Sequence, residues 1–386
     1  MKNSHLEKLA WFDGKVEIQR YDVVRHDRIE KWNNQGLGFF WRPEEVDVTK
    51  DKSDYASLAD NEKHIFKMNL SRQILLDSIQ GRAPAEIFLP LASTPENENA
   101  VMNWTFQETI HSRSYTHILR NVLNQPGEVF DEVLEIRQIV ELAEEINQYY
   151  DSLASYNAMR AVLEDRYASD TVKGAVSAEY DLYEHKKAFW RALFAVNALE
   201  GVRFYVSFAC SWAFMEMKEK MEGNAKILKL ICRDENLHLA FTQLHINRFT
   251  QEDPDFVMIK QELELEMLML FMDVVNQEKQ WAKFLFEKGD MLGLNYDICC
   301  AYIDWIASKR LAAIGMTYPL EVPSSNPLPW TNHWINGSSK QTALQEAEND
   351  SYVLGSLSGS LHNCRQSLAA KFGPLIRSVQ TANTRD

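Results

Sequence analysis

Apolar residues recur at helical spacing in six long segments of the chain. Within each segment they return every third or fourth position, which is the period of an amphipathic helix. Proline and glycine residues fall between the segments and give each pattern an end. The pattern therefore predicts an all-α fold. The segments are Lys63–Ile79, Ala100–Asn124, Ala188–Met221, Asn224–Arg248, Phe256–Glu287 and Ile298–Ile314.

The helical patterns run on without a repeat, a linker or a shift of composition between them. We therefore expect one helical domain over residues 1–335, including an N-terminal extension. In "MEGNAK" we expect Gly223 to end one helix and Asn224 to cap the next. The stretch "EVPSSNPLPWTNHW" is rich in proline, and polar sequence follows it. Such composition seldom forms a packed core, so we expect residues 336–386 to be a flexible tail.

Composition narrows the classes of function. The chain has 386 residues and a formal net charge of -14, which offers no basic surface to nucleic acid or to an anionic membrane. The start lacks the apolar run of a signal peptide, and no stretch suggests a membrane-spanning helix. The five cysteines form no C-x-x-C pair. We therefore expect a cytoplasmic protein with neither a nucleic-acid nor a membrane partner.

Four carboxylates interrupt the apolar helices, and two of them are followed by a histidine. Glu108 precedes His111 by three positions, and Glu235 precedes His238 by three, so each pair shares a helix face. One Glu-x-x-His pair alone is often only a surface contact. Two such pairs, with two single carboxylates on other helices, are the ligand set of di-iron or di-manganese sites in helical bundles. The single carboxylates are Asp77 and Glu200.

A tyrosine lies on the same stripe as the first pair. Tyr115 follows His111 by one helical turn, so its phenol faces the same side as both proposed ligands. The residue can be a buried tyrosine that fills space, or a group that the metal centre oxidises.

Several longer motifs resemble those of one family. They are "FFWRPEEVDV", "LLDSIQGRAP", "ETIHSRSYTHI", "NALEGVRFYVSFACSWAF", "EGNAKIL" and "RDENLHL". From about Phe39 to Trp334 the chain resembles the small, radical-generating β subunit of class I ribonucleotide reductase, of the bacterial and phage type. That resemblance implies a ferritin-like helical bundle with a di-metal carboxylate site in its core.

The resemblance also implies a ligand set and a radical site. Two iron ions would be held, one by Asp77, Glu108 and His111, the other by Glu200, Glu235 and His238. Manganese is the less favoured alternative. Dioxygen would react at the metals, and Tyr115 would be oxidised to a stable radical. The family's apolar pocket around the radical corresponds to Phe204, Phe208 and Ile231.

A route for the radical follows from the same resemblance. Trp41, coupled to His111 through Asp234, and Tyr352 in the tail would pass the oxidising equivalent onward. The acceptor is a cysteine in a separate large catalytic α subunit, which reduces ribonucleotides to deoxyribonucleotides. The β subunit of the family is a homodimer. One departure concerns the end of the chain, which the family keeps acidic: here Arg365, Lys371, Arg377 and Arg385 stand against only Asp386.

Two other classes share the metal ligands. One is a di-iron oxidase or oxygenase that acts directly on a small organic substrate, and the other is a ferritin-like iron-storage protein. The first needs neither the Trp41–Asp234 pair nor Tyr352, and the second needs neither Tyr115 nor a chain of this length. The residues present favour the reductase subunit over both alternatives.

Overall fold

The structure, a computed structural model, describes residues 4–336. The predicted all-α fold is confirmed, because every regular element in this range is a helix. The α-helices are α1 (Asp27–Gly38), α2 (Asp51–Ala56), α3 (Asp60–Gln80), α4 (Pro95–Val122), α5 (Pro126–Glu132), α6 (Arg137–Glu164), α7 (Asp170–Glu179), α8 (Leu182–Ala198), α9 (Tyr205–Lys218), α10 (Glu222–Glu252), α11 (Pro254–Glu262), α12 (Glu264–Leu285), α13 (Tyr296–Ala313) and α14 (Thr331–Asn336). Short 3₁₀ or π turns are η1 (Ser4–Leu6), η2 (Pro43–Glu45), η3 (Pro84–Phe88), η4 (Leu89–Leu91), η5 (Val133–Glu135) and η6 (Leu199–Arg203).

Internal contacts divide the chain into residues 1–341 and 342–386. All of the described residues belong to the first unit. The predicted tail over residues 336–386, with Tyr352, lies outside the described residues apart from residue 336 itself. The domain boundary at residue 335 therefore stays a prediction.

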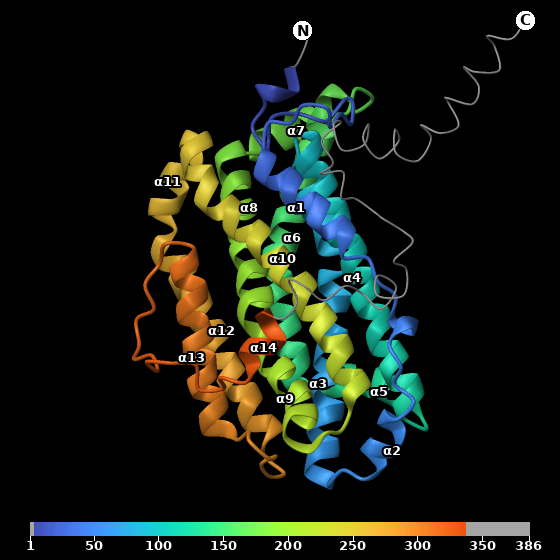
Figure 1. The fold of residues 1–386 in the computed structure, drawn as a ribbon. Coiled ribbons are helices and arrows are strands. Elements are labelled where there is room, and N and C mark those ends of the chain that lie inside the picture. Colours follow the sequence, from blue (N-terminus) through green and yellow to red (C-terminus); the bar gives the residue numbers. More distant parts are fainter. Residues whose placement is uncertain (1–3, 337–386) are drawn as a thin grey trace, which may run out of the picture. The chain divides into compact units, whose positions relative to one another are not determined.

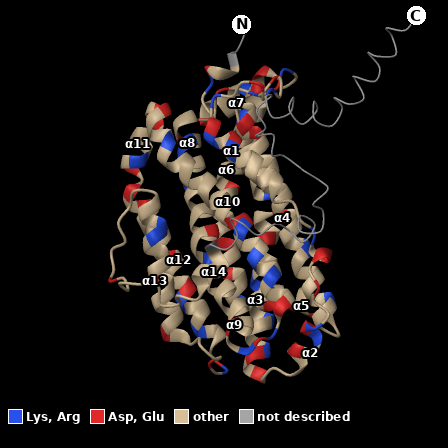
Figure 2. Cartoon of the chain, viewed as in Figure 1, with Lys and Arg blue, Asp and Glu red and all other residues tan. Residues whose placement is uncertain are grey.

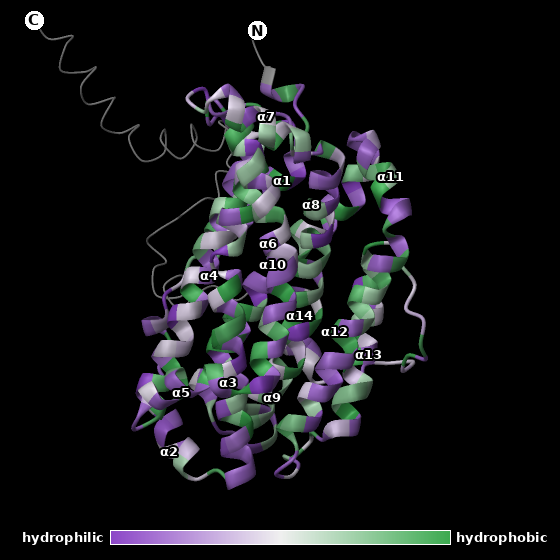
Figure 3. Cartoon of the chain, turned by 180° about the vertical axis from the view of Figure 1, so that it is seen from behind, coloured by the Kyte–Doolittle hydropathy of each residue, from purple (hydrophilic) through white to green (hydrophobic). Residues whose placement is uncertain are grey.

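Long helices lie side by side at the centre of this unit (Figure 1). α3 packs against α4 and α9, and α10 packs against α4, α8 and α9. Hydrophilic and hydrophobic residues are mixed along most of the helices (Figure 3). In the view of Figure 2, acidic and basic residues are interspersed on the helices and form no face of one sign. The buried core therefore lies between the helices that carry the predicted ligands.

The sequence pattern missed two of the helices that support this centre. α1 and the 28-residue α6 fall outside the six predicted segments, because charged residues dilute their apolar stripe. α6 nevertheless buries Ile139, Leu142, Ile146, Tyr150 and Leu153 at helical spacing against α3 and α8. The predicted helix over residues 256–287 is two helices, since the ladder breaks at Leu263 between α11 and α12.

The start of α10 also differs from the prediction. Gly223 and Asn224 lie inside its first turn rather than before it, and Met221 in the left-handed region precedes the helix. The backbone amides of Gly223 and Asn224 donate to the two oxygens of the buried Asp51 carboxylate, at 3.1 and 2.6 Å. A Cβ at Gly223 would lie 2.5 Å from a backbone oxygen of residue 47, so the close approach of the two segments requires glycine.

One run of described residues, Leu182–Lys218, is long and apolar enough in composition to cross a membrane. The sequence analysis found no stretch that suggests a membrane-spanning helix, so its criterion of length and apolar composition was too strict. The most apolar window of this run is entirely buried within the protein, as in the core helix of many soluble proteins.

Candidate metal centre

Six predicted ligands from four helical segments meet in the core. Asp77 comes from α3, Glu108 and His111 from α4, Glu200 from η6, and Glu235 and His238 from α10. Two overlapping groups form, and within each the ligand atoms lie within 4.8 Å of one another. Glu108 and Glu235 belong to both groups, as bridging carboxylates would. The groups are Asp77, Glu108, His111 and Glu235, and Glu108, Glu200, Glu235 and His238.

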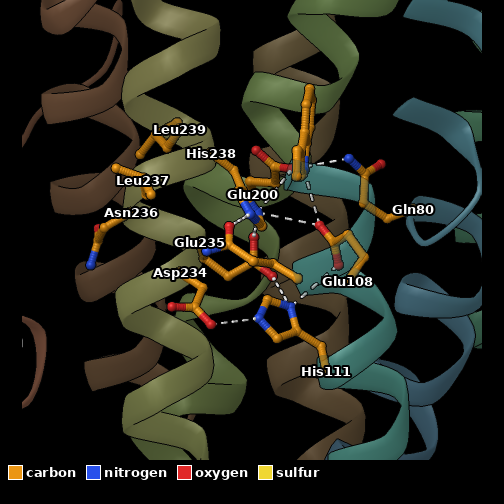
Figure 4. Close-up of polar contacts among 12 residues, drawn as sticks. Gln80, Glu108, His111, Glu200, Asp234, Glu235, Asn236, Leu237, His238 and Leu239 are labelled. Atoms are coloured by element: carbon orange, nitrogen blue, oxygen red, sulfur yellow. Dashed lines mark hydrogen bonds and ion pairs between the residues drawn. The ribbon is translucent and has the colours of Figure 1, made fainter. Parts of the chain in front are cut away.

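Both histidines point Nδ1 at the shared carboxylates (Figure 4). His111 Nδ1 lies 3.3 Å from Glu108 Oε2 and 3.1 Å from Glu235 Oε1. His238 Nδ1 lies 3.3 Å from Glu108 Oε1 and 3.4 Å from Glu235 Oε2. Each imidazole therefore offers one nitrogen to the centre of the cluster and keeps the other for a supporting partner.

The protonation chemistry of the cluster fits bound cations. All six side chains are fully buried, and both oxygens of Asp77 and Oε2 of Glu200 lack hydrogen-bond partners. Burial, together with the charges of Glu108 and Glu235, raises the pKa of Asp77 and of Glu200 well above the usual range. Burial acts the same way on Glu108, but hydrogen bonds from the two histidines outweigh it and lower its pKa to about 2. Unpaired buried carboxylates are costly, and two divalent metals would offset that cost.

Glu200 owes its position to an irregular turn. It lies in the π-helical segment η6, which interrupts the chain between α8 and α9. Such single π turns are rare and are frequent at functional sites. Next to Glu200, Gly201 packs against α10, where a Cβ would lie 3.1 Å from Leu239 Cδ1. The predicted continuous helix over residues 188–221 did not include this turn.

A charged network supports His111. Its Nε2 lies 3.3 Å from Asp234 Oδ2, which also accepts a hydrogen bond of 2.8 Å from Trp41 Nε1. Arg233 Nε donates to the other oxygen of Asp234 at 3.1 Å. The structure thus brings Trp41, Asp234 and His111 together in the order that the sequence analysis expects. A carboxylate behind a ligating histidine fixes its ring and raises its basicity.

Neutral side chains support the other ligands, and the sequence analysis missed all of them. Gln107 Oε1 lies 2.8 Å from His238 Nε2, and Trp104 Nε1 donates to Glu108 Oε1 at 3.1 Å. Gln80 Nε2 donates to Glu200 Oε1 at 2.9 Å, and Tyr150 donates to Gln80 Oε1 at 2.7 Å. Only their polar type at otherwise apolar helix positions could have pointed to them.

Tyr115 is fully buried on α4, and its hydroxyl faces the carboxylate of Asp77. Burial and the neighbouring charge of Asp77 raise the pKa of the phenol well above its ordinary value. Phe204, Phe208 and Ile231 are also fully buried, and the rings of Phe204 and Phe208 stack with centroids 5.7 Å apart. Their function as a radical pocket stays a prediction.

Comparisons with known proteins show the family of this chain. The family model described as ribonucleotide reductase, small chain, matches residues 20–327. The ribonucleoside-diphosphate reductase 1 subunit beta of Salmonella typhimurium is 47% identical over 358 residues, covering 92% of this chain and 94% of the relative. The subunit beta of Enterobacteria phage T4 is 39% identical over 360 residues, covering 91% and 93%. The solved ribonucleotide reductase R2 subunit from Clostridium botulinum has a TM-score of 0.72 at 25% identity, covering 86% of this chain and 95% of its own.

Proposed function

The chain belongs to the ribonucleotide reductase small-chain family, and from this premise we propose how its buried cluster works. The protein is the β subunit of ribonucleoside-diphosphate reductase, an oxidoreductase that supplies DNA precursors together with a large subunit. Its core binds metal, and we propose that the cluster holds two iron ions and that dioxygen is used there to oxidise Tyr115. The main support for this proposal is the enclosed set of four carboxylates and two histidines beside a buried phenol.

The residues of the cluster bind the metals, and one of them also accepts the phenolic proton of Tyr115. The chemistry supplied by two bound iron ions is the reduction of dioxygen, which yields the oxidising equivalent. Glu108 and Glu235 face both metal positions, whereas Asp77 and Glu200 each belong to one. Tyr115 gives up an electron and its phenolic proton, and the carboxylate of Asp77 lies beside the hydroxyl as an acceptor. Complete burial of the phenol keeps water and soluble reductants away from the radical.

We propose that the hydrogen-bonded set of His111, Asp234 and Trp41 carries the oxidising equivalent out of the core. The Trp41 indole is almost fully buried, and its N–H donates to Asp234, so an electron can leave the ring while the proton moves to the carboxylate. Tyr352 would continue the route to the large subunit.

The choice of iron rests on chemistry rather than on geometry. Carboxylate and imidazole ligands accept iron and manganese alike. Ferrous iron reacts with dioxygen without a flavoprotein partner, so we favour iron. Metal analysis of the native protein distinguishes the two metals directly.

An exposed apolar surface supports the proposed homodimer. Leu37, Phe40, Met102 and Phe106 are between 46% and 62% exposed. Leu37 lies on α1, Phe40 just after it, and Met102 and Phe106 lie on α4, which packs against α1. The rings of Phe40 and Phe106 stack with centroids 6.1 Å apart. Apolar groups of this size on a soluble protein mark an interaction site, and a second copy of the chain could bury them about a two-fold axis.

We also propose a cytoplasmic location. The four described cysteines, Cys210, Cys232, Cys299 and Cys300, are free thiols. Free thiols are typical of a reducing compartment.

Electron paramagnetic resonance tests the proposed function. Metal-free protein is loaded anaerobically with ferrous iron and then exposed to oxygen. We expect a tyrosyl signal that Tyr115→Phe abolishes while both irons remain bound. The matched control is Tyr302→Phe, since Tyr302 is another fully buried tyrosine but lies on α13, which carries none of the predicted ligands. Iron oxidation without a radical in the unaltered protein would contradict the proposal.

A further inference from the structure

Four aromatic rings form a stacked column that leads away from the metal centre. Phe204 and Phe208 stack at 5.7 Å, Phe208 and Trp212 at 5.5 Å, and Trp212 and Trp334 at 5.8 Å between centroids. The first three residues recur every four positions, so they share one face at the start of and along α9. Phe204 follows the ligand Glu200 by one turn, and Trp334 comes from α14, which packs on α9 and α10.

The two tryptophans of this column have different surroundings. Trp212 is fully buried, and its indole N–H has no hydrogen-bond partner. Trp334 is 9% exposed, and its N–H donates to Glu216 Oε2 at 3.2 Å. Lys229 Nζ lies 5.5 Å from the Trp334 ring centroid, and His333 Nε2 lies 3.4 Å from Glu216 Oε2. The outer end of the column therefore pairs an indole with a proton-accepting carboxylate, as Trp41 is paired with Asp234.

Packing alone does not account for an indole at residue 212. A phenylalanine there could stack on both neighbours, since the stacking requires only the ring. A buried N–H without a partner lowers the stability of the fold, and a phenylalanine would avoid that loss. What the indole adds is chemical, because tryptophan is far easier to oxidise by one electron than phenylalanine.

We propose that Trp334 and Trp212 form a second electron route, which carries an electron from the protein surface to the metal centre. This proposal rests on the proposed function. Reduction of dioxygen to water takes four electrons, of which two ferrous ions supply two and Tyr115 supplies one. The fourth electron comes from outside the protein, and the column gives it a path through stacked rings.

The step at the outer end balances as follows. Trp334 gives one electron inward through Trp212, and its Nε1 proton passes to Glu216 Oε2. The positive charge of Lys229 beside the ring disfavours a radical cation, so the proton transfer accompanies the electron transfer. A soluble one-electron reductant, such as a thiol, then reduces the indolyl radical, and Glu216 returns the proton. An indolyl radical is a stronger oxidant than a tyrosyl radical. Electron transfer from the tryptophans of the column to the radical at Tyr115 is therefore unfavourable.

The test uses the Tyr115→Phe protein, in which the tyrosine cannot supply its electron. The metal-free protein is loaded with ferrous iron, mixed with oxygen and freeze-quenched for electron paramagnetic resonance. We expect a transient tryptophanyl signal that changes when the indole rings are deuterated. The signal should be lost when either Trp334→Phe or Trp212→Phe is added. Trp305→Phe is the matched control, because Trp305 stacks on Tyr302 in α13, outside the column.

Two further readouts separate electron transfer from packing. Glu216→Gln should keep the column folded but change the signal to that of a protonated indole radical. Peptide mass spectrometry after the reaction, without added reductant, should find oxidised Trp334, and Trp212→Phe should remove that product. Trp334→Phe lies near the surface, so it serves even if Trp212→Phe does not fold.

A tryptophanyl signal that survives both substitutions, or that only Trp41→Phe removes, would overturn the proposed route. So would iron oxidation in Tyr115→Phe with no tryptophanyl signal. Failure of the proposed function looks different, because the unaltered protein would then form no radical at Tyr115.

Discussion

The two histidines of the cluster, which are predicted ligands, have different partners at Nε2, although their Nδ1 atoms face the same carboxylates. His111 Nε2 contacts the carboxylate of Asp234, whereas His238 Nε2 contacts the amide oxygen of Gln107. A charged acceptor makes an imidazole a stronger donor to a metal than a neutral one does. We therefore expect the two metal positions to be unequal, with Gln107 as the positioning residue of the second.

Replacing Gln107 tests this difference. Gln107→Leu leaves His238 Nε2 without an acceptor, so one of the two metals should bind about 10–100-fold more weakly. Titration calorimetry of the metal-free protein with Mn²⁺ measures both positions without turnover. Gln107→Glu restores an acceptor and should restore binding, while Thr109→Ala, on the exposed side of α4, should change nothing. Equal weakening at both positions would count against a local effect.

Among single residues, the sequence pattern predicted which carboxylates and histidines meet in the core, but not the neutral side chains that contact them. Asp77, Glu200 and the two Glu-x-x-His pairs stood out because charged groups seldom interrupt apolar helices. Gln107, Gln80 and Trp104 carry no charge, and an amide or indole on a helix has no spacing rule that marks it. Their partners lie 131, 120 and 4 residues away in the chain, so only the packed structure pairs the first two.

Among the helices, α10 carries both Glu235 and His238, and its first turn is held from outside. The carboxylate of Asp51 accepts hydrogen bonds from the amides of Gly223 and Asn224, which have no partner within the helix. Asp51 therefore acts as a capping residue supplied by α2, far away in the sequence.

Asp51→Ala should lower the free energy of unfolding by about 1–2 kcal/mol, the usual loss for a missing helix cap. Urea unfolding followed by circular dichroism measures the change. Asp47→Ala is the control, since that side chain is exposed and bonds only within its own turn. The Asp51 variant should still bind two metals, because the ligands lie more than two turns along the helix. A stability equal to that of the control would show that water replaces the cap.

The helices themselves followed from periodicity wherever their apolar stripes were strong. α3, α4, α10 and α13 lie close to their predicted segments. α6 was missed because seven charged residues interrupt its sequence and dilute its apolar stripe. The π turn at Glu200 was missed for a different reason: an extra residue in one turn leaves no trace in a 3.6-residue pattern, and the contacts of Gly201 with α10 stabilise it.

Over the whole protein, buried neutral histidines couple stability to pH. Burial lowers the pKa of His26, lowers that of His245 well below its usual value, and lowers that of His185 to about 3. These groups stay neutral in the folded state but titrate near pH 6.5 when unfolded. Stability from them is complete above about pH 6.5 and falls as the pH drops, because the unfolded chain then binds more protons.

His245→Gln removes one of the imidazoles that bind a proton when the chain unfolds. Below about pH 6.5, the free energy of unfolding should fall less steeply than in the unaltered protein, by about 1.4 kcal/mol per pH unit. Urea titrations of the metal-free protein at several pH values give the two slopes. Trp11→Phe removes the 2.9 Å hydrogen bond to His245 Nδ1 but keeps the histidine, so it should lower stability and retain the slope. Identical slopes for His245→Gln and the unaltered protein would contradict the assignment.

The apolar surface between α1 and α4 connects the metal centre to assembly. α4 carries Glu108 and His111 on its buried face and Met102 and Phe106 on its exposed face, so one helix serves the site and the proposed dimer. Phe106→Glu places a charge on that surface twice in a symmetric dimer. If Phe106 is a central anchor worth about 2 kcal/mol per copy, dimer dissociation should rise about thousandfold.

Sedimentation equilibrium of the metal-loaded protein measures that change. Phe130→Glu on α5 is the matched control, because that ring is 36% exposed but lies away from the α1–α4 contact. The Phe106 variant should keep two metals per chain, since the substitution leaves the buried face of α4 intact. A dimer that persists in Phe106→Glu would move the interface to another surface, and a monomeric unaltered protein would remove the homodimer. Loss of metal together with loss of the dimer would mean that α4 holds its ligands in place only when a second copy covers its outer face.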